Sequence, residues 1–94
     1  MANYLARVEL HKASHDDYEV LHGAMKQRGF LRVIVAGNGK KYRLPTGTYV
    51  VEDTNANLEQ AYAAAESGAG DTGKSFWAIV VDWTAAKFLL EAVS

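Results

Sequence analysis

The residues from Tyr4 to His11 read Tyr-Leu-Ala-Arg-Val-Glu-Leu-His and alternate in character with a period of two. This alternation is typical of a β-strand with one covered face. The covered face would carry only apolar side chains, those of Tyr4, Ala6, Val8 and Leu10. The other face would carry Leu5, Arg7, Glu9 and His11. We therefore expect the strand to lie on a core with its polar side toward water or a partner.

A helix is expected directly after this strand. Ser14 and Asp17 have the spacing of a capping box, and apolar residues then recur at helical spacing. Gly29 can adopt the left-handed conformation that often ends a helix. These features predict a helix over roughly residues 14–28.

A hairpin is expected next. Residues 31–36 are rich in β-branched side chains, and Gly37-Asn38-Gly39 supplies the positive φ angles of a tight turn. The return strand over residues 40–44 is interrupted at residues 45–47 and resumes over residues 48–52, which predicts a bent or bulged strand.

The second half repeats the helix–strand pattern. Residues 53–57 contain several candidate N-caps, and residues 58–68 form an alanine-rich amphipathic stretch. Residues 75–83 are almost continuously apolar, as expected of a central strand covered on both sides or of a face held in an oligomer. The tail, residues 84–93, is expected to form a short capping helix.

The order β-α-β-β-α-β predicts an α+β fold, namely a ferredoxin-like sandwich. In that arrangement an antiparallel four-stranded sheet carries two helices on one face and leaves the other face open. The length of 94 residues leaves room for only one domain, residues 1–94.

Composition excludes several classes of function. The chain has ten basic and eleven acidic residues, so no overall field draws it to nucleic acid or to an anionic membrane. It has no cysteine, which excludes disulfides, thiolate metal sites and cysteine nucleophiles. The N-terminus lacks the blocks of a signal peptide, and the longest apolar run, Phe76 to Val81, is too short to span a bilayer. We expect a cytoplasmic protein that is not in a membrane.

Residues 68–75, Gly-Ala-Gly-Asp-Thr-Gly-Lys-Ser, match the phosphate-binding loop pattern letter for letter. That loop binds phosphate only when a strand precedes it and a helix follows it. The predicted order here is helix and then strand. The match is therefore interpreted as a flexible turn.

The three histidines, His11, His15 and His22, do not predict a metal site. His15 and His22 are seven residues apart on the expected helix, which is a poor spacing for chelation. Neighbouring Glu19 and Lys26 indicate a solvated helix face instead. No cofactor is expected.

The best-defined candidate site consists of Arg7, Glu9 and His11, because a β-strand directs these three alternate side chains to the same face. A carboxylate, an imidazole and a guanidinium could act as base, acid and anion clamp on a phosphodiester. The alternative is a solvated polar face with local charge pairing.

A second candidate is the basic cluster of the hairpin, which could contact RNA phosphates or bases. Its members are Lys40, Lys41, Tyr42 and Arg43, with Arg28 and Arg32 nearby in the sequence. Lysines also protect exposed strand edges against aggregation, and both interpretations stay open.

The aromatic residues could stack on bases, but a core or dimer-interface role is favoured. They include Tyr49, Tyr62, Phe76, Trp77 and Trp83. We expect a homodimer formed through the open sheet face or the last strand, with two-fold symmetry.

Scattered positions resemble the GhoS antitoxin family. The residues concerned are Tyr4, Glu9, Asp17-Tyr18, Leu21, Met25, Gly29-Phe30, Ile34 and the stretch from Tyr42 to Tyr49. The resemblance covers roughly the first 55 residues. It implies a ferredoxin-like fold close to that of the small CRISPR-associated nuclease of the adaptation machinery, and an endoribonuclease that cuts the messenger of a partner membrane toxin.

The resemblance also implies roles for individual residues. Glu9 matches the acidic residue that this wider fold group often places at the end of its first strand, although a glutamate carries one methylene more than an aspartate. A functional arginine of the first helix would fall near His22, and Arg28 is the nearest arginine.

Two functions are therefore expected. The first is a small endoribonuclease, in a toxin–antitoxin setting, that cleaves single-stranded or messenger RNA. The alternative is a non-catalytic phage or prophage interaction module that inhibits or regulates a host system through a protein partner; the near-neutral net charge favours this second function.

Overall fold

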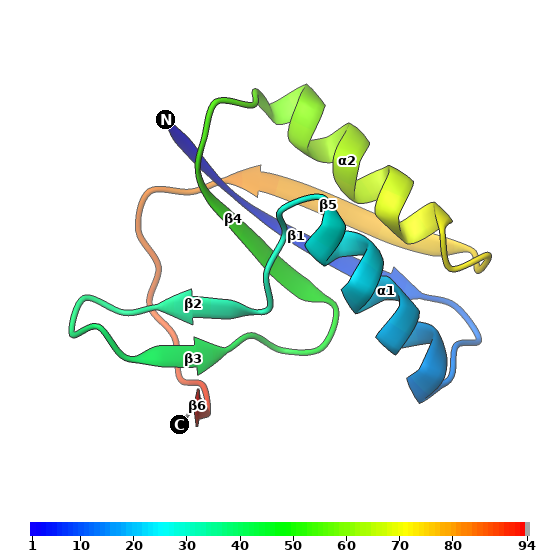
Figure 1. Cartoon of the computed structure of the whole chain (residues 1–94), viewed down its shortest axis with the longest axis horizontal. Helices are drawn as coiled ribbons and strands as arrows, with labels where there is room; N and C mark the ends of the chain where they lie inside the picture. Colours follow the sequence, from blue (N-terminus) through cyan, green and yellow to red (C-terminus); the bar gives the residue numbers. More distant parts are fainter. Residues whose placement is uncertain (94) are drawn as a thin grey trace.

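The computed structural model describes residues 1–93 and has two helices and two small antiparallel sheets (Figure 1). The elements in chain order are β1 (Ala2–Leu10), α1 (His15–Gln27), β2 (Val33–Val35), β3 (Lys41–Arg43), β4 (Thr48–Thr54), α2 (Leu58–Gly70), β5 (Phe76–Asp82) and β6 (Ala92–Val93). The predicted α+β class is confirmed.

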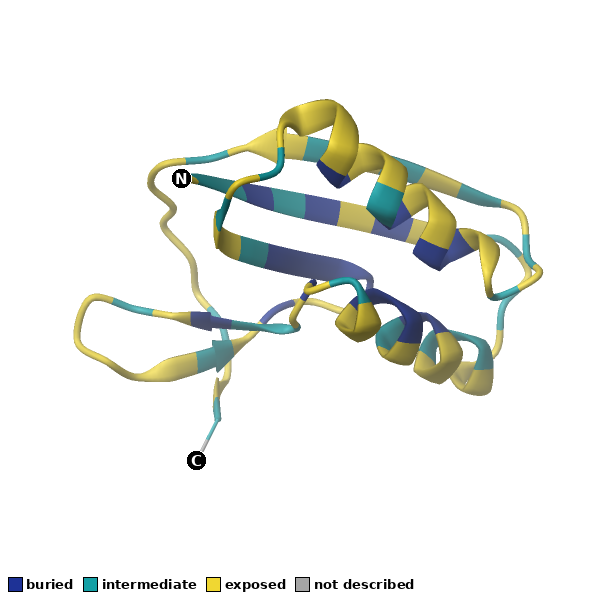
Figure 2. Cartoon of the chain, turned by 45° about the horizontal axis from the view of Figure 1, so that its top comes forward, coloured by how far each residue is buried: buried dark blue, intermediate teal, exposed yellow. Residues whose placement is uncertain are grey.

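The main sheet has the order β4-β1-β5, and both pairings are antiparallel. The two helices cover one face of this sheet, with their buried residues toward it (Figures 1 and 2). As predicted, β1 divides into a covered and an exposed side. Its apolar residues Tyr4, Ala6, Val8 and Leu10 are at most 5% exposed, whereas Arg7 and Glu9 are exposed.

The core beneath the helices combines the apolar side of β1 with Tyr49 of β4 and the inward stripes of both helices. The helix residues that reach it are Leu21, Met25, Ala61, Ala65 and Ala69. Small alanines let α2 approach the sheet closely. Gly68 lets α2 approach α1, since a Cβ there would lie 2.8 Å from Met25 Sδ.

The predicted hairpin is present, but it belongs to a second sheet of order β2-β3-β6. One β-bridge joins the hairpin segment to the main sheet, and in it Leu31 and Val50 exchange two hydrogen bonds of 2.8 Å. After Leu31 the chain leaves β4 and turns into the hairpin. The four-stranded ferredoxin-like sheet stays a prediction, because only this bridge occupies the position of its fourth strand.

The interrupted return strand consists of two strands in different sheets, β3 and β4. Gly47 lies at the break with φ +84°, and its carbonyl oxygen accepts a hydrogen bond of 2.7 Å from Val8 N–H. A Cβ at this position would collide with the carbonyl oxygen of Val8. Glycine is therefore required where the chain re-enters the main sheet beside β1.

Two predictions for the C-terminal part were wrong. Residues 84–91 form no helix; they run as an extended segment that ends in β6, which pairs with β3. Phe88 of this segment packs on Tyr42 with ring centroids 5.2 Å apart, so tertiary contacts override the helical tendency of the tail. For the apolar residues 75–83, the alternative of a central strand is wrong, because β5 lies at the edge of the main sheet; the alternative of a face held in an oligomer stays a prediction.

The second sheet has its own small core, formed by Ile34, Leu44 and Val50 with Leu5 and Trp83 packed against them. This cluster covers part of the main-sheet face that the helices leave free. The part of that face around Arg7 and Glu9 stays open. Within residues 1–93, no helix is long and apolar enough to cross a bilayer.

Candidate functional site

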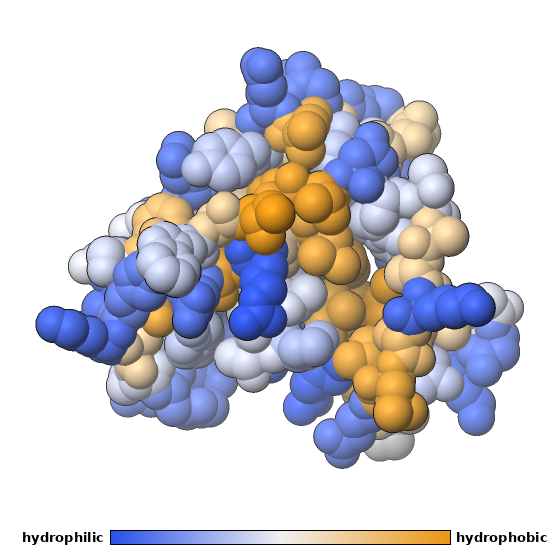
Figure 3. Space-filling view, turned by 180° about the vertical axis from the view of Figure 1, so that it is seen from behind, coloured by the Kyte–Doolittle hydropathy of each residue, from blue (hydrophilic) through white to orange (hydrophobic). Residues whose placement is uncertain are grey.

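The open part of the main sheet places Arg7 and Glu9 beside two exposed apolar residues of β5. Glu9 is directly opposite Trp77, and Arg7 is opposite Ile79. Trp77 is 70% exposed and Ile79 58% exposed. Together with Ala78 these residues line a shallow hollow of about 190 Å³. Figure 3 shows this side of the molecule, where apolar side chains form a central area bordered by hydrophilic ones.

His11 shares this side of the strand but does not line the hollow. Its Nδ1 lies 3.2 Å from Ser75 Oγ, and its ring packs edge-on against Trp77 with centroids 4.8 Å apart. Its Nε2 is buried without a hydrogen-bond partner among residues 1–93. The imidazole therefore packs against Trp77, and its Nδ1 edge faces Ser75.

The hollow brings together groups suited to a nucleotide. A guanidinium binds phosphate with directed hydrogen bonds, and an exposed indole offers a surface on which a base can stack. In the described part of the chain neither Arg7 nor Glu9 forms an ion pair within 4.0 Å. Both charges are therefore available to a ligand.

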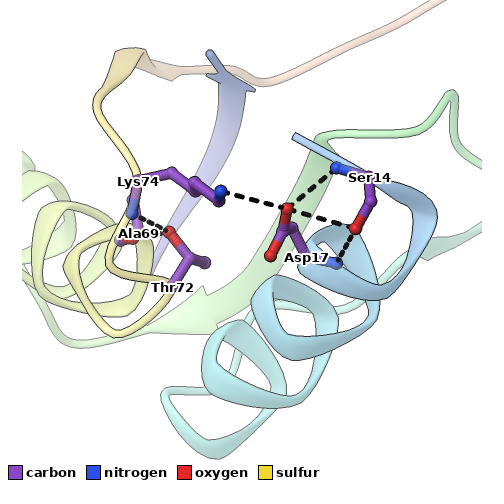
Figure 4. A network of polar contacts seen from close by, with 5 residues as sticks. All are labelled: Ser14, Asp17, Ala69, Thr72 and Lys74. Atoms are coloured by element: carbon purple, nitrogen blue, oxygen red, sulfur yellow. Dashed lines mark hydrogen bonds and ion pairs between the residues drawn. The ribbon is translucent and has the colours of Figure 1, made fainter. Parts of the chain in front are cut away.

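The stretch that matches the phosphate-binding loop covers the last residues of α2 and the loop to β5, in the predicted order of helix and then strand. Figure 4 shows how its polar groups are used. Thr72 Oγ1 donates to Ala69 O and accepts from Lys74 N–H, and Lys74 Nζ lies 3.7 Å from Asp17 Oδ2. The lysine therefore binds a carboxylate at the start of α1.

Asp17 is itself part of the helix cap. Its Oδ2 accepts from Ser14 N–H at 2.8 Å, and Ser14 Oγ accepts from Asp17 N–H at 3.2 Å, so the predicted capping box is confirmed. The hydrogen bond from the Ser14 backbone, with the Lys74 charge nearby, lowers the pKa of Asp17 below 3.8. The loop thus stabilises a helix N-terminus.

The predicted basic cluster is divided between several places. Arg28 joins the two helices: its guanidinium donates to Ala24 O and Ser67 Oγ and forms an ion pair with Asp71 at 3.1 Å. Tyr42 faces the small core of the second sheet and Arg43 points to the other side. Lys40 is exposed at the turn. Only Arg32 and Lys41 meet, in a groove beside α1.

This groove has a volume of about 680 Å³, larger than the hollow beside Arg7 and Glu9, and lies between α1 and the hairpin. Residues from both walls and from the connecting segment line it: Glu19, His22, Gly23, Lys26, Phe30, Leu31, Arg32, Val33, Val35, Lys41 and Val93. Sequence reasoning treated His22 and Lys26 as a solvated helix face and assigned Arg32 and Lys41 to the hairpin cluster. Nothing in the local sequence shows that the hairpin folds back toward α1.

His22 is held in one orientation by the core. Its Nδ1 lies 2.6 Å from the hydroxyl of Tyr49, a residue with no exposed surface. Burial raises the pKa of Tyr49, so the phenol stays protonated and donates to Nδ1. Burial, with a smaller effect of the Arg32 charge, lowers the pKa of His22 below 6.5. At neutral pH His22 is therefore uncharged, with its proton on Nε2.

The aromatic residues differ in their exposure. Of the aromatic residues, Tyr49 is in the core as favoured, while Trp77 is exposed beside the candidate site. No group of three or more His, Cys, Asp or Glu side chains that could hold a metal occurs in residues 1–93. Comparison of the chain with protein-family models, curated proteins and solved structures gave no match.

Proposed function

We propose that the protein binds and cleaves single-stranded RNA in the hollow of the open sheet face. The observation that carries this proposal is the meeting of a guanidinium, a carboxylate and an exposed indole, from Arg7, Glu9 and Trp77, in one solvent-facing hollow. A sheet face with exposed aromatic residues is a common platform for splayed bases. The toxin–antitoxin setting implied by the resemblance to the GhoS family is part of the same proposal.

The fold is proposed to be a divergent ferredoxin-like sandwich. The order β4-β1-β5, two helices on one face and the Leu31–Val50 bridge support this assignment. In this view the second strand keeps one bridge to the sheet, and the rest of it has moved into the hairpin.

The proposed reaction is an internal displacement at phosphorus. Glu9 removes the proton of a ribose 2′-hydroxyl, whose oxygen forms a new bond to the adjacent phosphorus while the bond to the 5′-oxygen breaks. Arg7 balances the negative charge that develops on the phosphate oxygens. The leaving 5′-oxygen takes its proton from water, because His11, whose Nδ1 lies 3.2 Å from Ser75 Oγ, does not line the hollow.

The test uses a labelled single-stranded RNA incubated with the purified protein, with and without a divalent-metal chelator. Glu9→Gln is expected to reduce cleavage by about 10²-fold or more while RNA is still bound. Glu52→Gln, another exposed strand carboxylate, is the matched control and should cleave normally. Intact RNA with the wild-type protein in both conditions would reject the nuclease.

Substitutions of Trp77 test base stacking in RNA binding separately from RNA cleavage. Trp77→Phe should retain most RNA binding, and Trp77→Ala should weaken it by about 1–3 kcal/mol, the usual contribution of one stacked base. Equal binding by both variants would show that bases do not stack there.

We also propose a homodimer that forms through the free edge of β5. Three exposed apolar residues, Trp77, Ile79 and Val81, lie along this unpaired strand. An antiparallel copy centred on Ile79 would place Trp77 opposite Val81 and complete the hydrogen bonds of both edges. The same apolar strip also supports the second candidate function, a non-catalytic module that binds another protein through β5.

A further inference from the structure

The groove between α1 and the hairpin has an aliphatic floor. Leu31, Val33, Val35 and Val93 contribute to it, and Leu31 and Val35 are 50% and 52% exposed. Exposed aliphatic surface inside a concave site is the usual lining of a small-molecule pocket. Apart from the His22 imidazole, Phe30 is the only aromatic ring lining the groove, and at 2% exposure it offers no stacking surface for a base.

Positive charge surrounds this floor. Lys26, Arg32 and Lys41 line the groove, with Glu19 as the one opposing carboxylate, although the whole chain carries a net charge of −1. None of the three cations has an ion pair in the described residues. Arg32 Nε is buried and has no hydrogen-bond partner within residues 1–93. Guanidinium and ammonium groups that have no partner form strong charge-assisted hydrogen bonds with a carboxylate or phosphate.

His22 adds a neutral donor to the same wall. Tyr49 fixes its tautomer, so the Nε2–H group is present at neutral pH. Gly23 lies next to it in the sequence, and a Cβ there would meet no atom within 4 Å, which leaves the wall open at this point.

We propose that this groove binds a small amphipathic anion, with an aliphatic body on the valine and leucine floor and a carboxylate or phosphate head between Arg32 and the two lysines. The proposal is independent of the RNA hollow, which lies on the sheet face away from the helices. A nucleic acid is disfavoured as the occupant because the groove floor is aliphatic and the His22 imidazole on its wall is held in place by Tyr49.

The experiment titrates the full chain with decanoate and with decyl phosphate, below their micelle concentrations, and follows backbone amides by NMR. Shifts should concentrate on residues that line the groove. The comparison of the two probes identifies the preferred head group. Decanol, with the same aliphatic body and no charge, should bind at least about tenfold more weakly than the better anion, because a charge-assisted hydrogen bond is lost.

Two kinds of variant test the assigned roles. Arg32→Gln and Lys41→Gln should each weaken binding of the better anion, Arg32→Gln by about tenfold or more, whereas Arg43→Gln on the same hairpin should not. Gly23→Leu should block the groove without unfolding the helix, since leucine is a better helix former than glycine.

The proposal is overturned if neither anion shifts the groove amides, if decanol binds as well as the anions, or if Arg32→Gln and Arg43→Gln have the same effect. Thermal unfolding of each variant separates a lost ligand contact from a lost fold.

Discussion

The hydroxyl of Tyr49, buried at the centre of the core, lies 2.6 Å from Nδ1 of His22 on the wall of the α1 groove. This contact links the protonation state of a groove residue to the stability of the fold. The pKa of His22 is lowered chiefly by burial, so the unfolded chain takes up this proton more readily than the folded chain does.

The stability contributed by neutral His22 should therefore be complete above pH 6.5 and should decrease as the pH falls below that value toward the lower folded-state pKa. Urea unfolding at a series of pH values between 7.5 and 5 measures this. His22→Gln keeps a neutral side chain that can accept from Tyr49 and should flatten the curve over this range. An unchanged curve in His22→Gln would contradict the assignment.

The Ser14–Asp17 capping box should contribute far more than the Lys74–Asp17 ion pair. Ser14→Ala is expected to lower the free energy of unfolding by about 1 kcal/mol, the usual value of an N-cap. Lys74→Ala should change it by less than about 1 kcal/mol, because the pair is solvent-accessible. Urea denaturation at neutral pH compares them. If Lys74 instead bound a nucleotide phosphate, ATP would stabilise the wild type and Lys74→Ala would abolish that stabilisation. We expect ATP not to stabilise the wild type.

Gly47 should not tolerate a side chain. Gly47→Ala combines a positive φ angle with a collision against the Val8 carbonyl, so it should lower the free energy of unfolding by more than 1 kcal/mol. Gly70→Ala is the matched control. It lies at the end of α2 in open space, and alanine there should be neutral or stabilising by up to about 1 kcal/mol. Equal effects of the two substitutions would refute the close approach of residue 47 to β1.

The β5 edge should determine the oligomeric state. We expect the wild type to sediment as a dimer and Ile79→Lys to sediment as a monomer, because a charge at the centre of the edge opposes itself across the two-fold axis. Val20→Lys, an exposed apolar residue on α1, should leave the dimer intact. A wild-type protein that is monomeric over the whole measured concentration range would refute edge pairing. The apolar strip of Trp77, Ile79 and Val81 would then be a candidate surface for binding a different protein.

The elements that local chemistry specifies could be predicted from the sequence. The alternation from Tyr4 to Leu10 gave the buried and exposed sides of β1, and Ser14 with Asp17 gave the start of α1. These features depend on neighbours within a few residues. The same pattern placed Arg7, Glu9 and His11 on the exposed side of one strand.

What could not be predicted depends on contacts between distant segments. The tail lacks helix because Phe88 and Leu90 cover the second sheet. The groove exists because the chain leaves β4 after Leu31 and brings Arg32 and Lys41 toward α1. Likewise, the sequence places His11 on the same side of β1 as Arg7 and Glu9. In the structure its ring packs against Trp77 and does not line the hollow.

Within residues 1–93, the Leu31–Val50 bridge is the one β-bridge between the hairpin segment and the main sheet. This bridge and the small core around Ile34, Leu44 and Val50 join the β2–β3 hairpin to the layer beneath it. Amides of the hairpin should therefore exchange with deuterium long before those of β1, which is paired on both sides. Such a local opening of the hairpin would widen the α1 groove while the two helices and the main sheet stay folded.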